Sequence, residues 1–566
     1  MLILGQPRTR KALPANAGTQ IGASERPQPR AATQVRIAAA TLAGLFLMVA
    51  GQLANLAWRA EQVVSAAMIE PVATSFSRPD IVDRNGRLLA TDVEVHSLYA
   101  DPARLLDRDE AIEKLAAKLP GLDEAELRRS LGDDTKRFVW VRRGLTPKVA
   151  QAVHDLGLPG FAFRKELRRA YPLGALAGHV LGRVDADNKG LGGIESYIDE
   201  HVGIDAVHAT RPSDRAPVRL SIDIGVQAGL EAELADAMAR YTTASVGALV
   251  MDARSGEIVA SASLPRIEPA RAADAADPAK RDRLQSGTYE LGSIFKLMTI
   301  AMALDRKQAT LDTMVDVRVP LNAGRFEIKD LHPAGRPLSV TGIFLQSSNV
   351  GAAMLALDAG TAAQREFLTR AGLLNAMTTQ AGAVAAPRPP QHWDRAETIT
   401  ISYGHGLAVA PLQFAASAAA LVNGGFAVQP TYLVRKSGDG ALASSRVVSR
   451  ETSAAIRTLM RANVTDAAGT GHRADVAGYE IGGKTGTADI AGPRGYHQGG
   501  VISSFFAAFP MSHPRYVALV MLFEPKPTAE TGGKVLAGLT AAPVTARIVA
   551  RIGPMLDLPN NRAVQP

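Results

Sequence analysis

The sequence predicts a membrane-anchored chain whose larger domain outside the membrane has a mixed α/β (α+β) fold. The chain has 566 residues, too many for one compact core, so two or more domains are expected. Residues 37–57 contain no charged residue, and about 20 apolar residues suffice to span a bilayer. Within residues 216–555, strand-like apolar runs lie near both ends and helical patterns lie between them. This order predicts one sheet built from both ends of the domain.

The composition is that of an ordinary globular protein. Hydrophobic residues make up 46% and charged residues 21% of the chain, which excludes collagen-like and disordered classes. Cysteine is absent, so structural disulfides, cysteine-ligated metals and a thiol nucleophile are excluded as well. A packed body that relies on other chemistry is therefore expected.

The net charge of +8 is concentrated before the apolar run. Residues 1–36 contain six basic residues and a single acidic one, whereas the rest of the chain is nearly balanced. This placement does not indicate a nucleic-acid partner. Basic residues on one flank of a membrane span hold that flank in the cytoplasm. We expect a cytoplasmic basic leader (1–36) and an uncleaved transmembrane anchor (37–57). The competing interpretation, a cleaved signal peptide, requires an apolar run of about 7–15 residues and an A-x-A-like site.

Residues 58–215 are predicted to form a first domain of short strands and small helices. Alternating residues around the Asn85-Gly86 turn predict strands within residues 78–102. Charged helices are expected at 107–119 and 122–131, and a third helix begins at Thr146-Pro147. A Pro- and charge-rich stretch from Arg211 marks the boundary to the next domain.

Residues 216–555 are predicted to form the second domain, followed by a C-terminal tail at 556–566. Its expected elements, in chain order, are a helix at 223–239, a hairpin of strands 246–252 and 258–263, a polar loop at 266–283, helical runs with loops from 292 to 481, and a buried strand at 516–523.

A pair of candidate catalytic residues, Ser293 and Lys296, lies where a loop enters the apolar helix 297–304. Residues three apart share a helix face, so the lysine amine can approach the serine hydroxyl. Serine is a weak nucleophile until a base accepts its proton, and a lysine of lowered pKa can be that base. Alone, the S-x-x-K pattern is weak evidence, and it favours a capping serine followed by an exposed lysine.

Two further motifs favour the catalytic interpretation. S-x-x-K, S-x-N (Ser347 to Asn349) and K-T-G (Lys484 to Gly486, followed by Thr487) each occur once, in the order that penicillin-recognising serine acyltransferases require. On these motifs the chain resembles a class B penicillin-binding protein, a D,D-transpeptidase of cell-wall synthesis. Further segments resemble the same family: RPDIVDRNGRLLATD (78–92), RRAYPLGALAGHVLGRVDADNKGLGGIE (168–195), LSID (220–223), GALVMDARSGEIVASASLP (247–265), YELGSIFK (289–296), YGHGLAVAPLQ (403–413), VNGG (422–425) and SFFAAFP (504–510).

The resemblance implies a penicillin-recognising serine transpeptidase fold with a five-stranded antiparallel sheet and flanking helices. It also implies that residues 58–215 form a pedestal, or dimerisation-like, domain. The leader, the length and the stretch 316–349 look most like division-specific, FtsI-type septal enzymes, and an elongation-specific relative is the nearest alternative. One departure is Leu291, which stands where the family commonly has proline before Gly-Ser.

The resemblance also implies a role for each motif residue. Ser293 would attack the penultimate D-alanine carbonyl of a peptidoglycan stem peptide, and Lys296 would accept its proton. Ser347 would relay a proton to the departing amine, and Asn349 would position Lys296 and the substrate amide.

The K-T-G strand would bind the substrate. Lys484 would lower the pKa of Lys296 and attract the stem carboxylate, which the hydroxyls of Thr485 and Thr487 would bind. Gly486 would leave room for the substrate backbone. The backbone N–H groups of Ser293 and Thr487 would form the oxyanion hole.

The implied setting is the bacterial inner membrane at the division septum, with a single span, a cytoplasmic amino terminus and a periplasmic catalytic body. Implied partners are peptidoglycan stem peptides, β-lactams as inhibitors, a membrane-embedded glycan polymerase and other division proteins; no cofactor or metal is implied. Three other functions are alternatives: a β-lactamase-type hydrolase, which would be shorter and lack an anchor; a penicillin-sensing receptor, which would need several spans; and a catalytically silent divisome scaffold, although every motif residue is retained.

Overall fold

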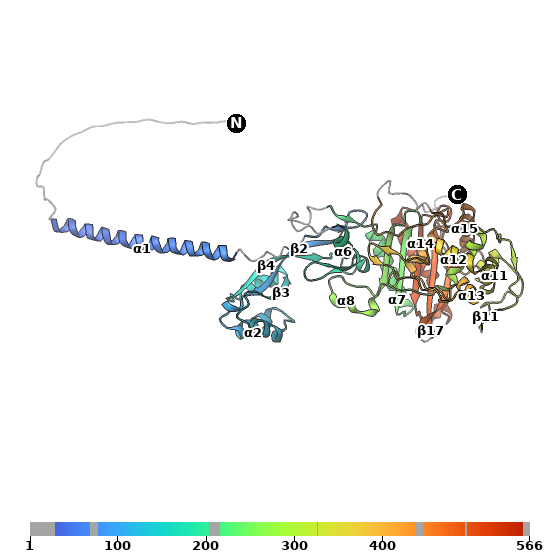
Figure 1. The fold of residues 1–566 in the computed structure, drawn as a ribbon, viewed down its shortest axis with the longest axis horizontal. Helices are drawn as coiled ribbons and strands as arrows, with labels where there is room; N and C mark the ends of the chain where they lie inside the picture. Colours follow the sequence, from blue (N-terminus) through green and yellow to red (C-terminus); the bar gives the residue numbers. More distant parts are fainter. Residues whose placement is uncertain are drawn as a thin grey trace, which may run out of the picture. The chain divides into compact units, whose positions relative to one another are not determined.

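The computed structural model describes residues 29–67, 77–202, 216–324, 326–435, 445–492 and 495–558. The chain divides into two units, residues 1–74 and 75–566. The first unit contains α1 (Pro29–Ala67), a single continuous helix (Figure 1). Its segment Arg36–Asn55 has a mean hydropathy of 1.9 and is, by length and composition, able to cross a bilayer. This segment coincides with the predicted apolar run.

The second unit begins with a five-stranded pedestal sheet in the order β3-β2-β1-β7, with β4 also paired to β2. Figure 1 shows β2, β3 and β4 beside one another. The predicted Asn85-Gly86 turn joins β1 to β2: Asp83 Oδ1 accepts the Asn85 and Arg87 N–H groups, and Gly86 has a φ of 83°. The strands are β1 (Ile81–Val82), β2 (Leu88–Ala100), β3 (Val139–Leu145), β4 (Phe161–Ala170) and β7 (Val218–Arg219).

The pedestal helices lie close to their predicted positions and start at side-chain caps. Asp107 and Asp123 cap α2 and α3, and Thr146 Oγ1 accepts the Val149 N–H at the start of α4. The helices are α2 (Arg108–Lys118), α3 (Glu124–Leu131), α4 (Pro147–His154), α5 (Gly178–Leu181) and α6 (Gly193–Tyr197), with the short strands β5 (Arg183–Val184) and β6 (Gly190–Gly192) paired between the last two.

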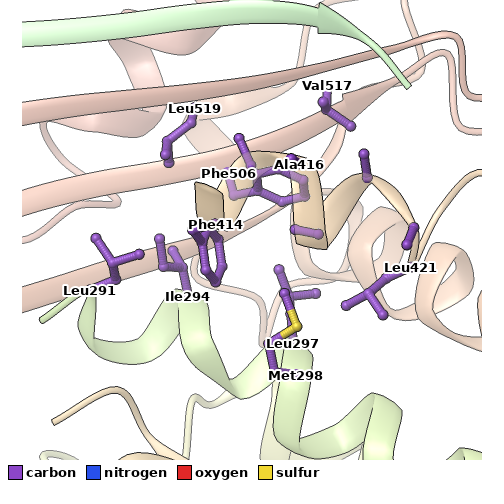
Figure 2. Close-up of a cluster of buried hydrophobic side chains, with 14 of the residues drawn as sticks. Leu291, Ile294, Leu297, Met298, Phe414, Ala416, Leu421, Phe506, Val517 and Leu519 are labelled. Carbon is purple, nitrogen blue, oxygen red and sulfur yellow. The ribbon is translucent and has the colours of Figure 1, made fainter. Parts of the chain in front are cut away.

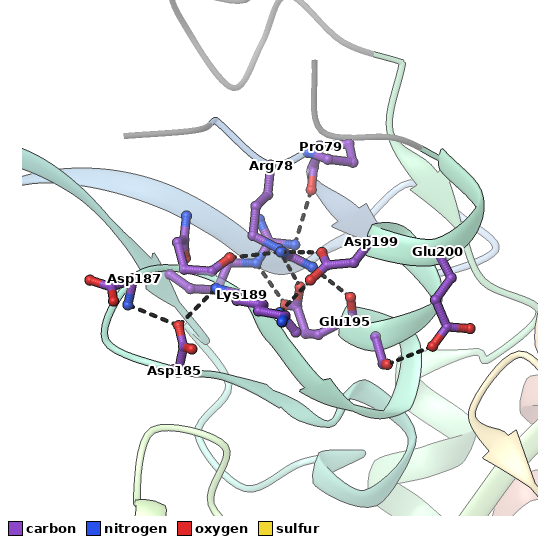
Figure 3. Close-up of polar contacts among 12 residues, drawn as sticks. Arg78, Pro79, Asp185, Asp187, Lys189, Glu195, Asp199 and Glu200 are labelled. Atoms are coloured by element: carbon purple, nitrogen blue, oxygen red, sulfur yellow. Dashed lines mark hydrogen bonds and ion pairs between the residues drawn. The ribbon is translucent and has the colours of Figure 1, made fainter. Parts of the chain in front are cut away.

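A buried ionic network fastens the start of the pedestal to its distant segments (Figure 3). The Arg78 guanidinium donates to Glu195 at 2.8 Å and to Asp199 at 2.5 Å. Arg169 donates to the other Glu195 oxygen at 2.7 Å and to Asp92 at 3.3 Å. Because each buried charge faces an opposite charge, the network satisfies groups that would otherwise be costly to bury. Four segments of the chain are thereby held in one arrangement.

The second domain contains the predicted five-stranded antiparallel sheet, in the order β16-β17-β18-β8-β9. The β8–β9 hairpin comes early in the domain and the other three strands come last, so the sheet combines both ends of the domain as predicted. The strands are β8 (Ser245–Asp252), β9 (Ile258–Leu264), β16 (Gly482–Gly492), β17 (Gly495–Phe509) and β18 (Tyr516–Phe523).

Both faces of this sheet are covered, which explains why β18 is apolar along its whole length. Val517, Leu519 and Met521 belong to one core cluster, and the alternate residues Ala518 and Val520 belong to the other. Figure 2 shows the first cluster, in which Leu519 and Phe506 of the sheet lie near Ile294 and Leu297 of the segment that carries the candidate nucleophile. The second cluster packs α7 and α16 against the opposite face.

Helices surround the sheet. The predicted polar loop at 266–283 contains two short pieces of helix, at Ala272–Ala276 and Pro278–Lys280. The predicted helix at 223–239 is α7, with Asp223 as its N-cap. The helices are α7 (Ile224–Arg240), α8 (Ala272–Ala276), α9 (Lys296–Asp305), α10 (Val340–Leu345), α11 (Asn349–Ala359), α12 (Thr361–Arg370), α13 (Arg395–Ser402), α14 (Pro411–Ala419), α15 (Arg450–Thr465) and α16 (Ala541–Ile552). Three small hairpins or bridges complete the domain: β10 (Met314–Val315) with β13 (Leu338–Ser339), β11 (Leu321–Ala323) with β12 (Phe326–Ile328), and β14 (Thr378–Thr379) with β15 (Gly382–Ala383).

Two predicted boundaries fall partly outside the described residues. The boundary stretch from Arg211 includes residues 211–215, and the tail 556–566 includes residues 559–566, none of which the structure describes.

Candidate active site

The candidate nucleophile Ser293 lies in a 3-10 turn, Gly292–Phe295, that continues into α9. The predicted helix 297–304 is α9 (Lys296–Asp305), and the residues just before it, predicted as the end of a loop, form this turn. Gly486 allows β16 to approach this turn closely: a Cβ there would lie 2.8 Å from the Leu291 carbonyl oxygen and 2.9 Å from Ile294 Cγ2. Leu291, at the family's proline position, is buried in the first core cluster, so packing fixes the turn.

Lys296 has the contacts expected of a base that serves Ser293. Its Nζ lies 2.9 Å from Ser293 Oγ and donates to Asn349 Oδ1 at 2.7 Å. It also lies 2.5 Å from the Ser347 carbonyl oxygen and 3.1 Å from Ser347 Oγ. Residues from the S-x-x-K and S-x-N motifs therefore meet at one nitrogen atom.

Ser347 connects the two lysines of the site. Its Oγ accepts from Lys484 Nζ at 2.9 Å while also lying beside Lys296 Nζ. Its backbone has a φ of 58°, in the left-handed region that non-glycine residues rarely adopt. This conformation allows its carbonyl and its hydroxyl to face Lys296 together.

Burial shapes the electrostatics of both lysines, whose side chains are 0% exposed. Desolvation, followed by the charge of Lys484, holds the pKa of Lys296 well below its usual range, and the carboxylate of Asp330 partly opposes this. Burial lowers the pKa of Lys484 to about 7. The lowered pKa favours the neutral amine of Lys296, the form that can accept a proton, and Lys484 carries its charge mainly below neutral pH.

The remaining motif residues lie along β16 beside Lys484. Thr485 Oγ1 is 2.7 Å from Thr470 Oγ1, and Thr487 Oγ1 accepts the Ala537 N–H at 3.2 Å. An accepting hydroxyl still has its own proton to donate, so Thr487 can bind an anion. A Cβ at Gly292 would lie 2.6 Å from the Thr487 carbonyl oxygen, so this end of β16 borders the Ser293 turn.

Asp330 is a site residue that the sequence analysis missed. Its Oδ2 accepts from Ser348 Oγ at 2.6 Å, and its Oδ1 accepts the N–H groups of Asn349 at 2.5 Å and Val350 at 3.0 Å. These N–H groups begin α11, where a helix leaves its first donors unsatisfied and favours negative charge. Asp330 therefore holds the Ser-Ser-Asn turn against Lys296. No short motif marks it, because the contact joins separate segments; only its polar character within the family-like stretch 316–349 was visible.

We expect Asp330→Asn to slow acylation of Ser293 by penicillin about tenfold, the scale of one lost hydrogen bond to a charged group. The asparagine NH2 cannot accept from Ser348, so the turn loses a contact. Because the Asp330 charge raises the pKa of Lys296, its removal should also move the acid limb of the pH–rate profile to lower pH. Stopped-flow acylation across pH measures both effects.

The matched control is Asp316→Asn, an exposed aspartate of the same segment that pairs with Arg318. It should leave the rate and the profile unchanged. An Asp330→Asn variant with the acid limb and rate of the unmodified protein would show that Asp330 does not position the turn.

Within the described residues, no group of three His, Asp or Glu side chains is arranged to hold a metal ion.

Comparison with known families assigns both domains. Residues 246–548 match the penicillin-binding protein transpeptidase domain, and residues 74–201 match the penicillin-binding protein dimerisation domain. The chain belongs to the penicillin-binding protein transpeptidases. Its two domains are those of the class B members, as the sequence predicted, and its pedestal is the dimerisation domain of that family.

Curated relatives agree with this assignment. The chain is 38% identical to the probable peptidoglycan D,D-transpeptidase FtsI of Caulobacter vibrioides, over 85% of this chain and 82% of the relative. It is 30% identical to the peptidoglycan D,D-transpeptidase FtsI of Escherichia coli K12, over 90% of each chain. The predicted FtsI type is therefore confirmed, and the elongation-specific alternative is not favoured.

A solved structure supports the fold. Penicillin-binding protein 3 of Mycobacterium tuberculosis, crystallised with aztreonam, matches with a TM-score of 0.64 and 23% identity, over 86% of this chain and 97% of that chain. The predicted fold, a penicillin-recognising domain with a five-stranded antiparallel sheet, is confirmed.

Proposed function

We propose that this chain is a septal peptidoglycan D,D-transpeptidase that crosslinks stem peptides through a serine acyl-enzyme. One observation carries the proposal: Lys296 Nζ lies 2.9 Å from Ser293 Oγ, and burial keeps its pKa low enough for it to act as a base. The chain's place among FtsI-type transpeptidases supplies the substrate class, the D-Ala-D-Ala end of a stem peptide.

In the proposed acylation step, Lys296 accepts the Ser293 proton as Oγ attacks the penultimate D-alanine carbonyl. The backbone N–H groups of Ser293 and Thr487 stabilise the oxyanion. Ser347 lies within hydrogen-bond distance of both lysines, so it can pass a proton from Lys296 to the departing D-alanine amine. Asn349 keeps Lys296 in place through its Oδ1.

Substrate binding is assigned to β16. Lys484 attracts the stem carboxylate, the hydroxyls of Thr485 and Thr487 bind it, and Gly486 brings the strand close to the Ser293 turn. An amine of a neighbouring stem peptide then attacks the acyl-enzyme to form the crosslink. β-Lactams acylate the same serine because their amide imitates the D-Ala-D-Ala end.

The test uses the full-length protein in detergent. A fluorescent penicillin should label it, and mass spectrometry should place the label on the peptide that contains Ser293. With a stem pentapeptide and an amine acceptor, release of D-alanine should accompany formation of a crosslinked product. No labelling and neither product would instead indicate a silent divisome scaffold.

The setting is proposed on the same basis. We infer that α1 anchors the chain in the inner membrane, with the leader in the cytoplasm and the catalytic body in the periplasm at the septum. The proposed partners are a membrane-embedded glycan polymerase and other division proteins, which would contact the anchor and the pedestal.

For the anchor, we expect an amino terminus at or near Met1 and a body that protease digests from the periplasmic side. The apolar segment Arg36–Asn55 is long enough to remain in the bilayer, and the basic leader favours the cytoplasm. Amino-terminal sequencing and protease treatment of spheroplasts check this. A mature terminus near residue 58 would instead indicate a cleaved signal.

A further inference from the structure

A polar cavity lies beside the segment that leads to Ser293. Its volume is about 450 Å³, and three of its lining residues are arginines: Arg281, Arg283 and Arg388. No aspartate or glutamate lines it. Within the part of the chain that the structure describes, none of these guanidinium groups has a carboxylate partner within 4.0 Å. Three uncompensated cations facing one cavity form a site for an anion.

Arg283 gives the strongest sign that a ligand belongs there. Its side chain hydrogen-bonds the Tyr289 side chain, but its Nε is buried and, among the described residues, no acceptor bonds that atom. Buried donors are normally hydrogen-bonded, so an unsatisfied one needs an explanation. The Arg283 guanidinium is held 5.7 Å from the centre of the Phe523 ring, which fixes its direction. Asp282 is adjacent in the chain, but its carboxylate accepts the Leu284 N–H and lines the adjoining cavity, which shares Arg281 and Ser286 with this one.

The cavity is built on the same backbone framework as the active site. Tyr289, in its wall, exchanges backbone hydrogen bonds with Val409, and Arg388 does so with Ala408. The same two segments continue to the Ser293 turn, where the Gly292 N–H donates to the Gly404 carbonyl at 3.1 Å. Tyr289 precedes Ser293 by four residues, so their Cα atoms are at most about 14 Å apart.

The separation between Tyr289 and Ser293 is within the length of a peptidoglycan stem peptide. An extended stem pentapeptide spans roughly 17 Å, so a peptide whose D-Ala-D-Ala end lies at Ser293 can reach the cavity. The planar guanidinium of arginine can donate two parallel hydrogen bonds to a carboxylate, which the compact ammonium of lysine cannot do. We propose that Arg281, Arg283 and Arg388 form an anion-binding subsite that takes a stem-peptide carboxylate other than the one at the D-Ala-D-Ala end.

This inference rests on the proposed function, and a phosphate group shares the chemistry that the arginines recognise. The experiment therefore uses the full-length protein in detergent and two probes. One is a stem pentapeptide in two forms, with its non-terminal carboxylates free or amidated, tested for protection of Ser293 against fluorescent penicillin. The other is inorganic pyrophosphate, tested by calorimetry.

In the unmodified protein, we expect the free-acid peptide to protect Ser293 about tenfold better than the amide, the scale of one charge-assisted hydrogen bond. In the double variant Arg283→Gln/Arg388→Gln the two peptides should protect Ser293 equally. Protection is measured in each variant as the labelling rate with peptide divided by the labelling rate without it. Arg283→Lys should fall between, because it keeps the charge and loses the fork. Arg254→Gln, an exposed arginine of the β8–β9 turn, should keep the tenfold difference.

The outcomes separate the possibilities. Equal protection by both peptides, with pyrophosphate binding that requires Arg283 and Arg388, assigns the subsite to phosphate. Equal protection with no arginine-dependent pyrophosphate binding overturns the subsite. The proposed function is tested separately, by whether penicillin labels Ser293 in the absence of peptide. Arg388 is exposed, so Arg388→Gln alone keeps the test available if the double variant does not fold.

Discussion

Replacing Ser293 with alanine is expected to abolish acylation by penicillin and leave the protein folded. The change removes the attacking oxygen and nothing else that the site needs, because Lys296 keeps its contacts with Ser347 and Asn349. The Ser293 hydroxyl caps no helix, and its loss removes one hydrogen bond, with Lys296 Nζ, which is worth about 1 kcal/mol. Gel fluorescence after incubation with labelled penicillin measures the first effect, and thermal unfolding measures the second.

Ser512→Ala provides the control, since Ser512 is exposed and lies in the turn between β17 and β18. It should be labelled at the rate of the unmodified protein. If Ser293→Ala were labelled undiminished, the assignment of the nucleophile would be wrong.

Replacing Lys484 with alanine is expected to slow acylation about 10²–10³-fold, the effect of losing one positioned transition-state donor. The change removes a charge that attracts the substrate carboxylate and that lowers the pKa of Lys296. Lys484→Arg should be intermediate, because the planar guanidinium cannot occupy the place of the compact ammonium 2.9 Å from Ser347 Oγ. Second-order rate constants for penicillin acylation give the order.

The pH dependence distinguishes the electrostatic role from a steric one. A lysine carries its charge below its pKa, so with a pKa of about 7 Lys484 loses its charge as pH rises above neutrality. The second-order constant reports groups of the free enzyme, and it should fall above about pH 7 in the unmodified protein. In Lys484→Arg this decline should vanish. In Lys484→Ala the pKa of Lys296 rises, so higher pH should partly restore the rate.

Lys534→Ala, at an exposed lysine, should behave like the unmodified protein in all of these measurements. Acylation of Lys484→Ala at the normal rate at neutral pH would refute the role, even with Ser293 confirmed as the labelled residue.

The elements that the sequence predicted well are those with strong local signals. The strand 516–523 is apolar throughout because both faces of its sheet are covered, and it was predicted with the bounds that the structure has. Asp223 and Thr146 cap helices through their own side chains, so these helix starts were visible. Pairings of two or three residues, such as β10 with β13, carry too little pattern to be predicted.

The features of the site also divide into those with a local sequence signal and those without one. Spacing alone indicated that Ser293 and Lys296 are neighbours, and the motif order linked them to Ser347 and Lys484. The left-handed backbone of Ser347 and the 3-10 geometry at Ser293 depend on tertiary packing, so no local pattern announced them. The contact of Asp330 with α11 is likewise long-range.

The strand order of the transpeptidase sheet has a consequence for biosynthesis. The central strand, β18, is the last of the five to leave the ribosome, and β8 and β9 are the first. Until residue 523 has emerged, the nascent β8 has an unpaired apolar edge, the kind of surface that promotes aggregation. Such long-range pairing also folds slowly. Chains truncated before residue 516 should therefore contain Ser293, Lys296 and Lys484 and still fail to react with penicillin, so catalytic competence would appear only once synthesis is nearly complete.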